Sequence, residues 1–216
     1  MAGIDGLRLA EMICARLCHD MSGLLGTLHT ALDMLEGDHR DSDDPLAIAR
    51  QNAGTLIARL RLLRAAWASN PDPLSLDRLK ALVAGSPAAH RVTLDLSGLP
   101  PDTVLSPPVA RVALNLILLA GESLPGGGEI IVAGTARDLF VQIQGPGARW
   151  PAGTAGCLVD EATAAAAVTN ARELQMPLTA LLAHGLGVRL SMLLPFGPAS
   201  GPPPIRLQIP PASRRA

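Results

Sequence analysis

The chain has 216 residues, of which 18 are basic and 19 acidic, and its formal net charge at pH 7 is -1. This balance lacks the positive charge that binding to a polyphosphate backbone requires, and two Trp and two Phe with no Tyr offer no platform for base stacking. Nucleic acid is therefore not an expected partner. Because 48% of the residues are hydrophobic, the chain can bury one large core or two smaller ones.

No segment is expected to enter a membrane. The longest apolar run, residues 112–120, is interrupted by Asn115 and is too short to span a bilayer, and the first residues show no leader pattern. We therefore expect a cytoplasmic protein. The three cysteines, Cys14, Cys18 and Cys157, match neither a disulfide framework nor a complete metal site, so we expect reduced thiols and no bound metal.

Two long amphipathic helices are predicted within residues 1–70, over Ala10–Leu35 and from Pro45 to about Ala68. The polar segment between them offers an Asp cap with Pro at the first helical position. The apolar seams consist of Ala10, Cys14, Leu17, Met21, Leu24, Leu28, Ala31 and Leu35 in the first helix, and of Leu46, Ala49, Ala53, Leu56, Leu60, Leu63 and Trp67 in the second. Because a two-helix hairpin cannot bury both seams, we expect a homodimer joined by a four-helix bundle.

Residues 71–210 are predicted to form an α+β domain, and residues 211–216 a disordered tail. Helices are expected over Leu74–Ala84, Pro107–Leu124 and most of residues 159–184, and strands over Arg91–Leu96, Glu129–Ala133, Leu139–Ile143, Gly187–Leu194 and Ile205–Ile209. A Pro-rich stretch, residues 195–204, connects the last two strands. The predicted fold class is therefore α+β, with a helical hairpin followed by an α/β sandwich.

His19 is the strongest candidate for a chemically active residue. On a helical projection it lies almost opposite the apolar seam, so we expect it to face water. A neutral imidazole nitrogen is a usable nucleophile near neutral pH, which suits phosphoryl transfer. The alternative is an ordinary surface histidine.

The face around His19 is predicted to carry small side chains in place of the usual Lys and Glu. Its members are Met12, Ala15, Ser22, Gly23 and Gly26. Two glycines inside a helix cost roughly 1 kcal/mol each relative to Ala. We interpret them as room for another protein to bring a phosphoryl group nearly in line with the imidazole. The alternative is that they permit a bend or tight packing.

Two charged neighbours of His19 are candidates for supporting roles. Asp20 is expected on the flank of the helix, where it would orient His19, accept its proton, or simply be solvated. Arg16 lies one turn before His19 and would help to offset phosphoryl charge. Its alternative is a surface arginine whose stem lies over the bundle.

These residues resemble a known family. The segment 17–20 (LCHD), followed by Gly26 and the segment 31–35 (ALDML), resembles the histidine phosphotransferases of the ChpT type, and the likeness continues through residues 59–65, 114–116 and 124–128. Many relatives have Pro where this chain has Leu24, which leaves the local helix bend open. His19 matches the phosphoryl-accepting histidine.

The resemblance implies a homodimer and a second domain with the fold of a histidine-kinase ATP-binding domain that binds no ATP. It implies phosphoryl transfer between the receiver domain of a hybrid histidine kinase and the receiver domains of response regulators, in the manner of CckA, CtrA and CpdR. Mg²⁺ would be supplied by the receiver domain. No cofactor of the chain itself is implied.

The residues themselves also argue against ATP binding. Alignment with kinase domains of this fold places Leu119 at the magnesium-binding Asn and Ile143 at the Asp that reads adenine. Aliphatic side chains neither coordinate a hard cation nor accept a hydrogen bond. An ATP-dependent histidine kinase is therefore disfavoured. A docking protein that binds receivers or kinases without becoming phosphorylated remains the alternative function.

Overall fold

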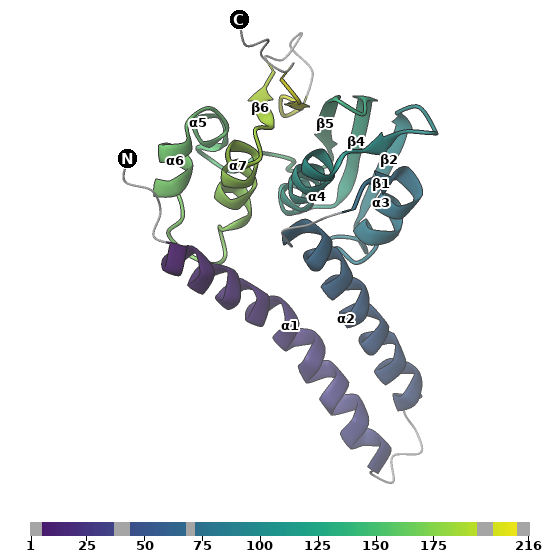
Figure 1. Ribbon diagram of the computed structural model, residues 1–216. Coiled ribbons are helices and arrows are strands. Elements are labelled where there is room, and N and C mark those ends of the chain that lie inside the picture. The colour runs from purple at the N-terminus through teal and green to yellow at the C-terminus, as the bar shows by residue number, and fades with distance from the viewer. Residues whose placement is uncertain (1–5, 37–43, 68–71, 194–200, 211–216) are drawn as a thin grey trace, which may run out of the picture.

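The computed structural model describes residues 6–36, 44–67, 72–193 and 201–210. Two long helices, α1 (Gly6–Glu36) and α2 (Pro45–Trp67), pack along each other and project from a domain built on a five-stranded sheet (Figure 1). We call α1 and α2 the helical pair and residues 72–210 the sheet domain. The predicted α+β class is confirmed. The predicted tail and the segments 37–43 and 194–200 lie outside the described residues.

The start of α2 follows the predicted cap. Pro45 is the first helical residue, and the carboxylate of Asp44 accepts a hydrogen bond from the Leu46 amide at 3.0 Å. Proline suits this position because the first amides of a helix have no partner within the helix, and an Asp cap satisfies one of them. No helix in the described parts of the chain is long and apolar enough to cross a membrane.

The helical pair buries only part of its predicted seams. Met21, Ala31, Ala49 and Leu63 are buried. The large apolar side chains that stay exposed are Leu7, Leu25, Leu32, Met34 and Leu35 of α1 and Leu46, Ile57 and Leu60 of α2. The seam residues among them are exposed because two helices enclose too little volume to cover both seams.

The sheet has the strand order β2-β4-β5-β7-β6. These strands are β2 (Val92–Gly98), β4 (Gly128–Thr135), β5 (Asp138–Gln144), β6 (Arg189–Met192) and β7 (Ile205–Gln208). Strands β2 and β4 are parallel and are connected through α4 (Pro107–Glu122), whereas every other pair is antiparallel. A parallel pair requires such a crossover. All five strands were predicted, with small shifts at their ends.

Two predicted helical segments differ in detail. The expected helix Leu74–Ala84 divides into β1 (Leu74–Ser75), which pairs with β3 (Val104–Leu105), and α3 (Leu76–Val83). Strands of two residues are too short to leave a periodic signal. The stretch 159–184 is also not one helix but falls into α5 (Thr154–Val159), α6 (Glu161–Ala166) and α7 (Gln175–Gly185).

The helical pair and the sheet domain share one hydrophobic core. Met21 of α1 and Leu62, Leu63 and Ala66 of α2 belong to the same buried cluster as the apolar residues of α4. A smaller cluster around Val168, Leu174 and Leu178 packs against Leu9, Met12 and Ile13 of α1. The core is therefore continuous between the helical pair and the sheet domain.

Hydrogen bonds of Asn115 and Arg111, which we call the polar lock, fix α4 to the end of α2. The Asn115 side chain is fully buried, and its Nδ2 donates to the Ala66 carbonyl at 2.8 Å. Its Oδ1 accepts from Trp67 Nε1 and Gln175 Nε2, each at 3.2 Å. Arg111 adds a bond to the Trp67 carbonyl at 2.8 Å. These donors satisfy carbonyls that the last turn of a helix leaves without partners.

The positions that would serve ATP in a kinase are part of the core. Leu119 and Ile143 are both fully buried. At the glycine-rich segments 126–128 and 145–147 the backbones pack directly together. A Cβ added to Gly128, which has a φ of +139°, would lie 2.1 Å from the Gln144 carbonyl oxygen. These glycines therefore serve the close approach of β4 and β5.

Candidate functional site

His19 faces solvent near the middle of α1. Its side chain is 67% exposed, as the helical projection predicted. The Asp20 carboxylate reaches the ring, with Oδ1 3.3 Å from His19 Nδ1. When Nδ1 carries the ring proton it donates to this oxygen, which leaves Nε2 with a free lone pair. Asp20 therefore contacts the histidine despite its place on the flank of the helix.

Asp20 is held from its other side. Its Oδ2 accepts a hydrogen bond from Arg16 Nε at 2.9 Å, and its side chain is only 13% exposed. Of the three roles considered for Asp20, simple solvation does not describe this environment. A carboxylate bound at both oxygens has a fixed orientation, because each bond restricts its rotation.

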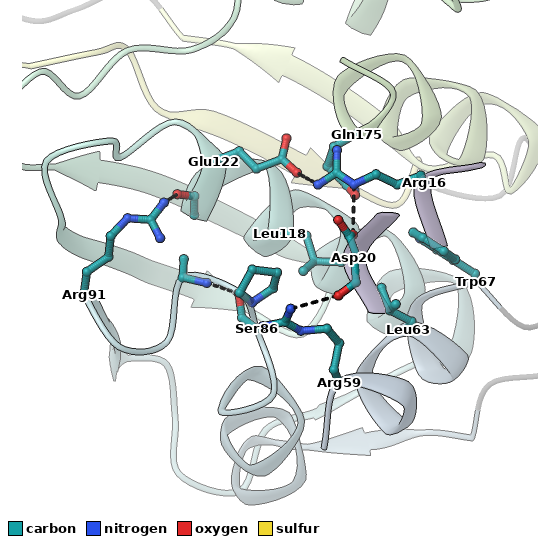
Figure 2. A pocket seen from close by; sticks show the side chains of 13 residues that line it. Arg16, Asp20, Arg59, Leu63, Trp67, Ser86, Arg91, Leu118, Glu122 and Gln175 are labelled. Carbon is teal, nitrogen blue, oxygen red and sulfur yellow. Dashed lines mark hydrogen bonds and ion pairs between the residues drawn. The ribbon is translucent and has the colours of Figure 1, made fainter. Parts of the chain in front are cut away.

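Arg16 is not a surface arginine. Its side chain is 16% exposed, its Nη2 contacts Glu122 Oε1 at 2.5 Å, and its Nη1 donates to the Arg172 carbonyl at 3.0 Å. Burial acts to lower the pKa of Arg16, but Glu122 and Asp20 outweigh it, and the pKa is raised. Figure 2 shows the guanidinium between the two carboxylates. Arg16 thus serves Asp20 and does not present its charge outward.

Glu122 was not anticipated from the sequence. It ends α4 in the sheet domain, and burial raises its pKa although Arg16 opposes that effect. Arg16, Asp20 and Glu122 line a small recess of about 80 Å³. Arg59 of α2 also lines it and donates to the Asp20 backbone carbonyl at 3.4 Å (Figure 2). The recess joins residues of α1, α2 and α4 that lie far apart in sequence.

Four members of the predicted small-residue face are exposed, and one is not. Ala15, Ser22, Gly23 and Gly26 are exposed, and a Cβ added to either glycine would meet nothing within 4 Å. Tight packing inside the chain therefore does not explain the glycines. Met12 is half-buried against the cluster of Val168, Leu174 and Leu178. The projection placed Met12 outward because it took no account of α7 and the segment that leads into it.

His29 provides an internal comparison on the same helix. It is exposed, and its Nδ1 lies 3.1 Å from Asp33 Oδ1. Asp33, however, is 64% exposed. An exposed carboxylate of this kind is screened and free to rotate. The anchored Asp20 is therefore what distinguishes the environment of His19.

The described residues contain no cluster of three or more His, Cys, Asp or Glu side chains with metal-site geometry. Cys14 and Cys18 are exposed, and Cys157 is buried. Burial raises the pKa of the Cys157 thiol, which disfavours its reactive thiolate.

The combination of helical pair and α+β domain defines a class of protein. A solved structure described as a bacterial phosphotransferase has the same fold, with a TM-score of 0.68 over 94% of this chain and 97% of its own, at 20% sequence identity. Residues 76–195, more than half of the chain, match the family described as histidine phosphotransferase C-terminal domain.

A curated relative narrows the assignment. The protein phosphotransferase ChpT of Brucella abortus (strain 2308) is 24% identical over 130 residues, which cover 60% of this chain and 62% of that protein. The chain belongs to the histidine phosphotransferase family, and its type is that of ChpT.

Proposed function

We propose that the chain is a phosphorelay intermediate in which His19 accepts a phosphoryl group from the phosphoaspartate of one receiver domain and passes it to the aspartate of another. The observation that carries this proposal is an exposed imidazole whose Nδ1 lies against an anchored carboxylate, Asp20. Such a contact selects the ring form with a nucleophilic Nε2.

The reaction is a transfer between two protein side chains. Nε2 of His19 attacks phosphorus, the bond between phosphorus and the aspartyl oxygen breaks, and the carboxylate leaves with the bonding electron pair. The positive charge that develops on the ring is stabilised by Asp20, which accepts the hydrogen bond from Nδ1. Return to a second aspartate follows the reverse course.

The partners we propose are the receiver domain of a hybrid histidine kinase of the CckA type and response regulators of the CtrA and CpdR types. The exposed Ala15, Ser22, Gly23 and Gly26 support a close approach of such a domain. The phosphoryl source is another protein and not ATP, because Leu119 and Ile143 occupy the corresponding ligand positions and are buried in the core.

The test is phosphoryl transfer from a purified receiver domain that carries labelled phosphoaspartate. The label is expected on this chain as an acid-labile, alkali-stable phosphohistidine, and peptide mass spectrometry is expected to place it on His19. The label is not expected from ATP alone. If the receiver binds and the chain never becomes labelled, the docking function is correct and the proposal is wrong.

We also propose that two copies assemble through the helical pair. The exposed apolar side chains of α1 and α2 lie on helices that pack along each other, and large exposed apolar surfaces of this kind mark interaction sites. Light scattering is expected to give a molar mass of twice the 22.4 kDa of one chain. Ile57→Glu with Leu60→Glu is expected to give monomers, whereas Val159→Glu, at an exposed apolar residue of the sheet domain, is not. A monomeric wild type would rule out this assembly.

Substitutions at Gly23 should separate an effect on the stability of α1 from an effect on the access of a receiver domain to His19. Gly23→Ala is expected to raise the free energy of unfolding by about 1 kcal/mol, because the new methyl meets no atom and Ala favours the helix. Gly23→Leu is expected to slow transfer about tenfold while the chain stays folded, because the larger side chain blocks the approach to His19. Gly185→Leu in the sheet domain is the control. An unchanged transfer rate in Gly23→Leu would contradict a docking role for this face.

A further inference from the structure

An unbroken line of contacts joins the sheet domain to the histidine. Glu122 Oε1 lies 2.5 Å from Arg16 Nη2, Arg16 Nε lies 2.9 Å from Asp20 Oδ2, and Asp20 Oδ1 lies 3.3 Å from His19 Nδ1. Three of these residues belong to α1, and Glu122 alone comes from α4. Figure 2 shows the first two contacts within the recess between the helical pair and the sheet domain.

Arg16 can hold Asp20 only while its own position is fixed. An isolated Arg and Asp four residues apart on a helix form a weak and mobile pair. Here the guanidinium is largely buried and also binds Glu122 and the Arg172 carbonyl. The raised pKa of Arg16, to which both Glu122 and Asp20 contribute against the effect of burial, agrees with a firmly held cation.

Glu122 itself has a fixed place relative to the helical pair. It is the last residue of α4, and α4 is attached to the end of α2 by Asn115 and Arg111. The contact between Glu122 and Arg16 therefore connects α1 to an element that is already bound to α2. Both helices of the pair therefore contact α4, and α4 fixes their positions relative to each other.

We propose that Glu122 is a positioning residue for phosphoryl transfer, through which the sheet domain orients Arg16 and Asp20 and so sets the ring form of His19. This inference rests on the proposed function of His19 and adds a role for a domain that has lost its nucleotide ligands. The competing explanation is that Glu122 and Arg16 only hold the two parts of the chain together.

The experiment compares Glu122→Ala and Glu122→Gln with Asp20→Asn and with Glu129→Gln, a charge removal elsewhere in the same domain. Two quantities are measured on the full chain: the single-turnover rate of transfer from a phosphorylated receiver, and the fraction of His19 protonated at Nδ1, from ¹⁵N NMR. The melting temperature of each variant shows that it is folded.

Removing one contact that stabilises charge developing in a transition state costs about 10²–10³-fold. We therefore expect Asp20→Asn to slow transfer about a hundredfold. We expect Glu122→Ala to slow it about tenfold, because Asp20 then keeps its contact but loses its fixed orientation. Glu122→Gln retains an acceptor for Arg16, so its loss should be smaller. The fraction protonated at Nδ1 should fall in the same order. Glu129→Gln should match the wild type in both quantities.

The outcomes distinguish the two proposals. If Glu122→Ala transfers at the wild-type rate and keeps the wild-type ring form while Asp20→Asn is slow, the positioning role is wrong and the function stands. If the wild type never becomes labelled, the proposed function fails, and the NMR comparison still decides whether Glu122 orients the ring. If Glu122→Ala does not fold, Glu122→Gln decides, because it changes charge without changing size. A melting temperature that falls without any change in rate or ring form would support the purely structural explanation.

Discussion

His19→Gln is expected to abolish acceptance of the phosphoryl group, reducing labelling from a phosphorylated receiver to background. Glutamine keeps the length and polarity of the side chain and favours the helix, so α1 should remain intact. It offers no nucleophilic nitrogen, because the amide lone pair is delocalised. The measurement is the time course of label transfer, together with the circular dichroism of the variant.

The matched control for this variant is His29→Gln. Both histidines are exposed on α1, and both have a carboxylate within 3.3 Å of Nδ1. They differ in the anchoring of that carboxylate and in their distance from the sheet domain along the helix. We expect His29→Gln to transfer like the wild type. Equal loss in both variants, or label that persists in His19→Gln, would refute the assignment of the phosphoryl group to His19.

The largest effect on stability is expected from Asn115→Leu. Leucine is close to isosteric, so little cavity forms, but Trp67 Nε1 loses its acceptor. The Gln175 amide keeps the Asn115 backbone carbonyl, and the Ala66 carbonyl keeps Arg111 Nε, although each loses one bond to the Asn115 side chain. A donor left without a partner costs about 1–3 kcal/mol, and each further lost bond about 1 kcal/mol. We expect the free energy of unfolding in urea to fall by about 3 kcal/mol.

Thr179→Val, in the same hydrogen-bond network, provides a comparison for the change in the free energy of unfolding of Asn115→Leu. The Thr179 hydroxyl donates to the Gln175 carbonyl at 2.7 Å, and valine replaces it with a group of the same shape. The loss of one such bond should cost about 1 kcal/mol. If Asn115→Leu proves no more destabilising than Thr179→Val, the lock between α2 and α4 contributes less than its geometry indicates.

These two residues show how differently the sequence informs on function and on architecture. His19 was identified from local features, the seam opposite to it and the motif around it, because the helical period places side chains without reference to the rest of the chain. Asn115 was noted only as the polar residue that interrupts an apolar run and as part of the family likeness. Its role as a cap for α2 depends on Ala66, a residue 49 positions away.

The differences between prediction and structure have the same origin. Met12 was assigned to the exposed face, and a surface position stayed open as the alternative for Arg16, because only the helical pair was considered. The cluster of Val168, Leu174 and Leu178 covers Met12, and Glu122 holds Arg16. The stretch 159–184 is mostly helical, as expected, but it is divided, because Asp160, with φ -125° and ψ 120°, ends α5 and caps α6 through the Thr163 amide.

The sequence by itself determined the helices of the pair, the main strands and the exposure of His19, since periodicity is a local property. Only the tertiary structure decided the surroundings of Asp20. Arg16 and Glu122 are 106 residues apart in sequence, and no periodic pattern relates them. They meet because the packing of α4 against α2 brings the sheet domain onto α1, and such closure is fixed by the whole core rather than by any segment of it.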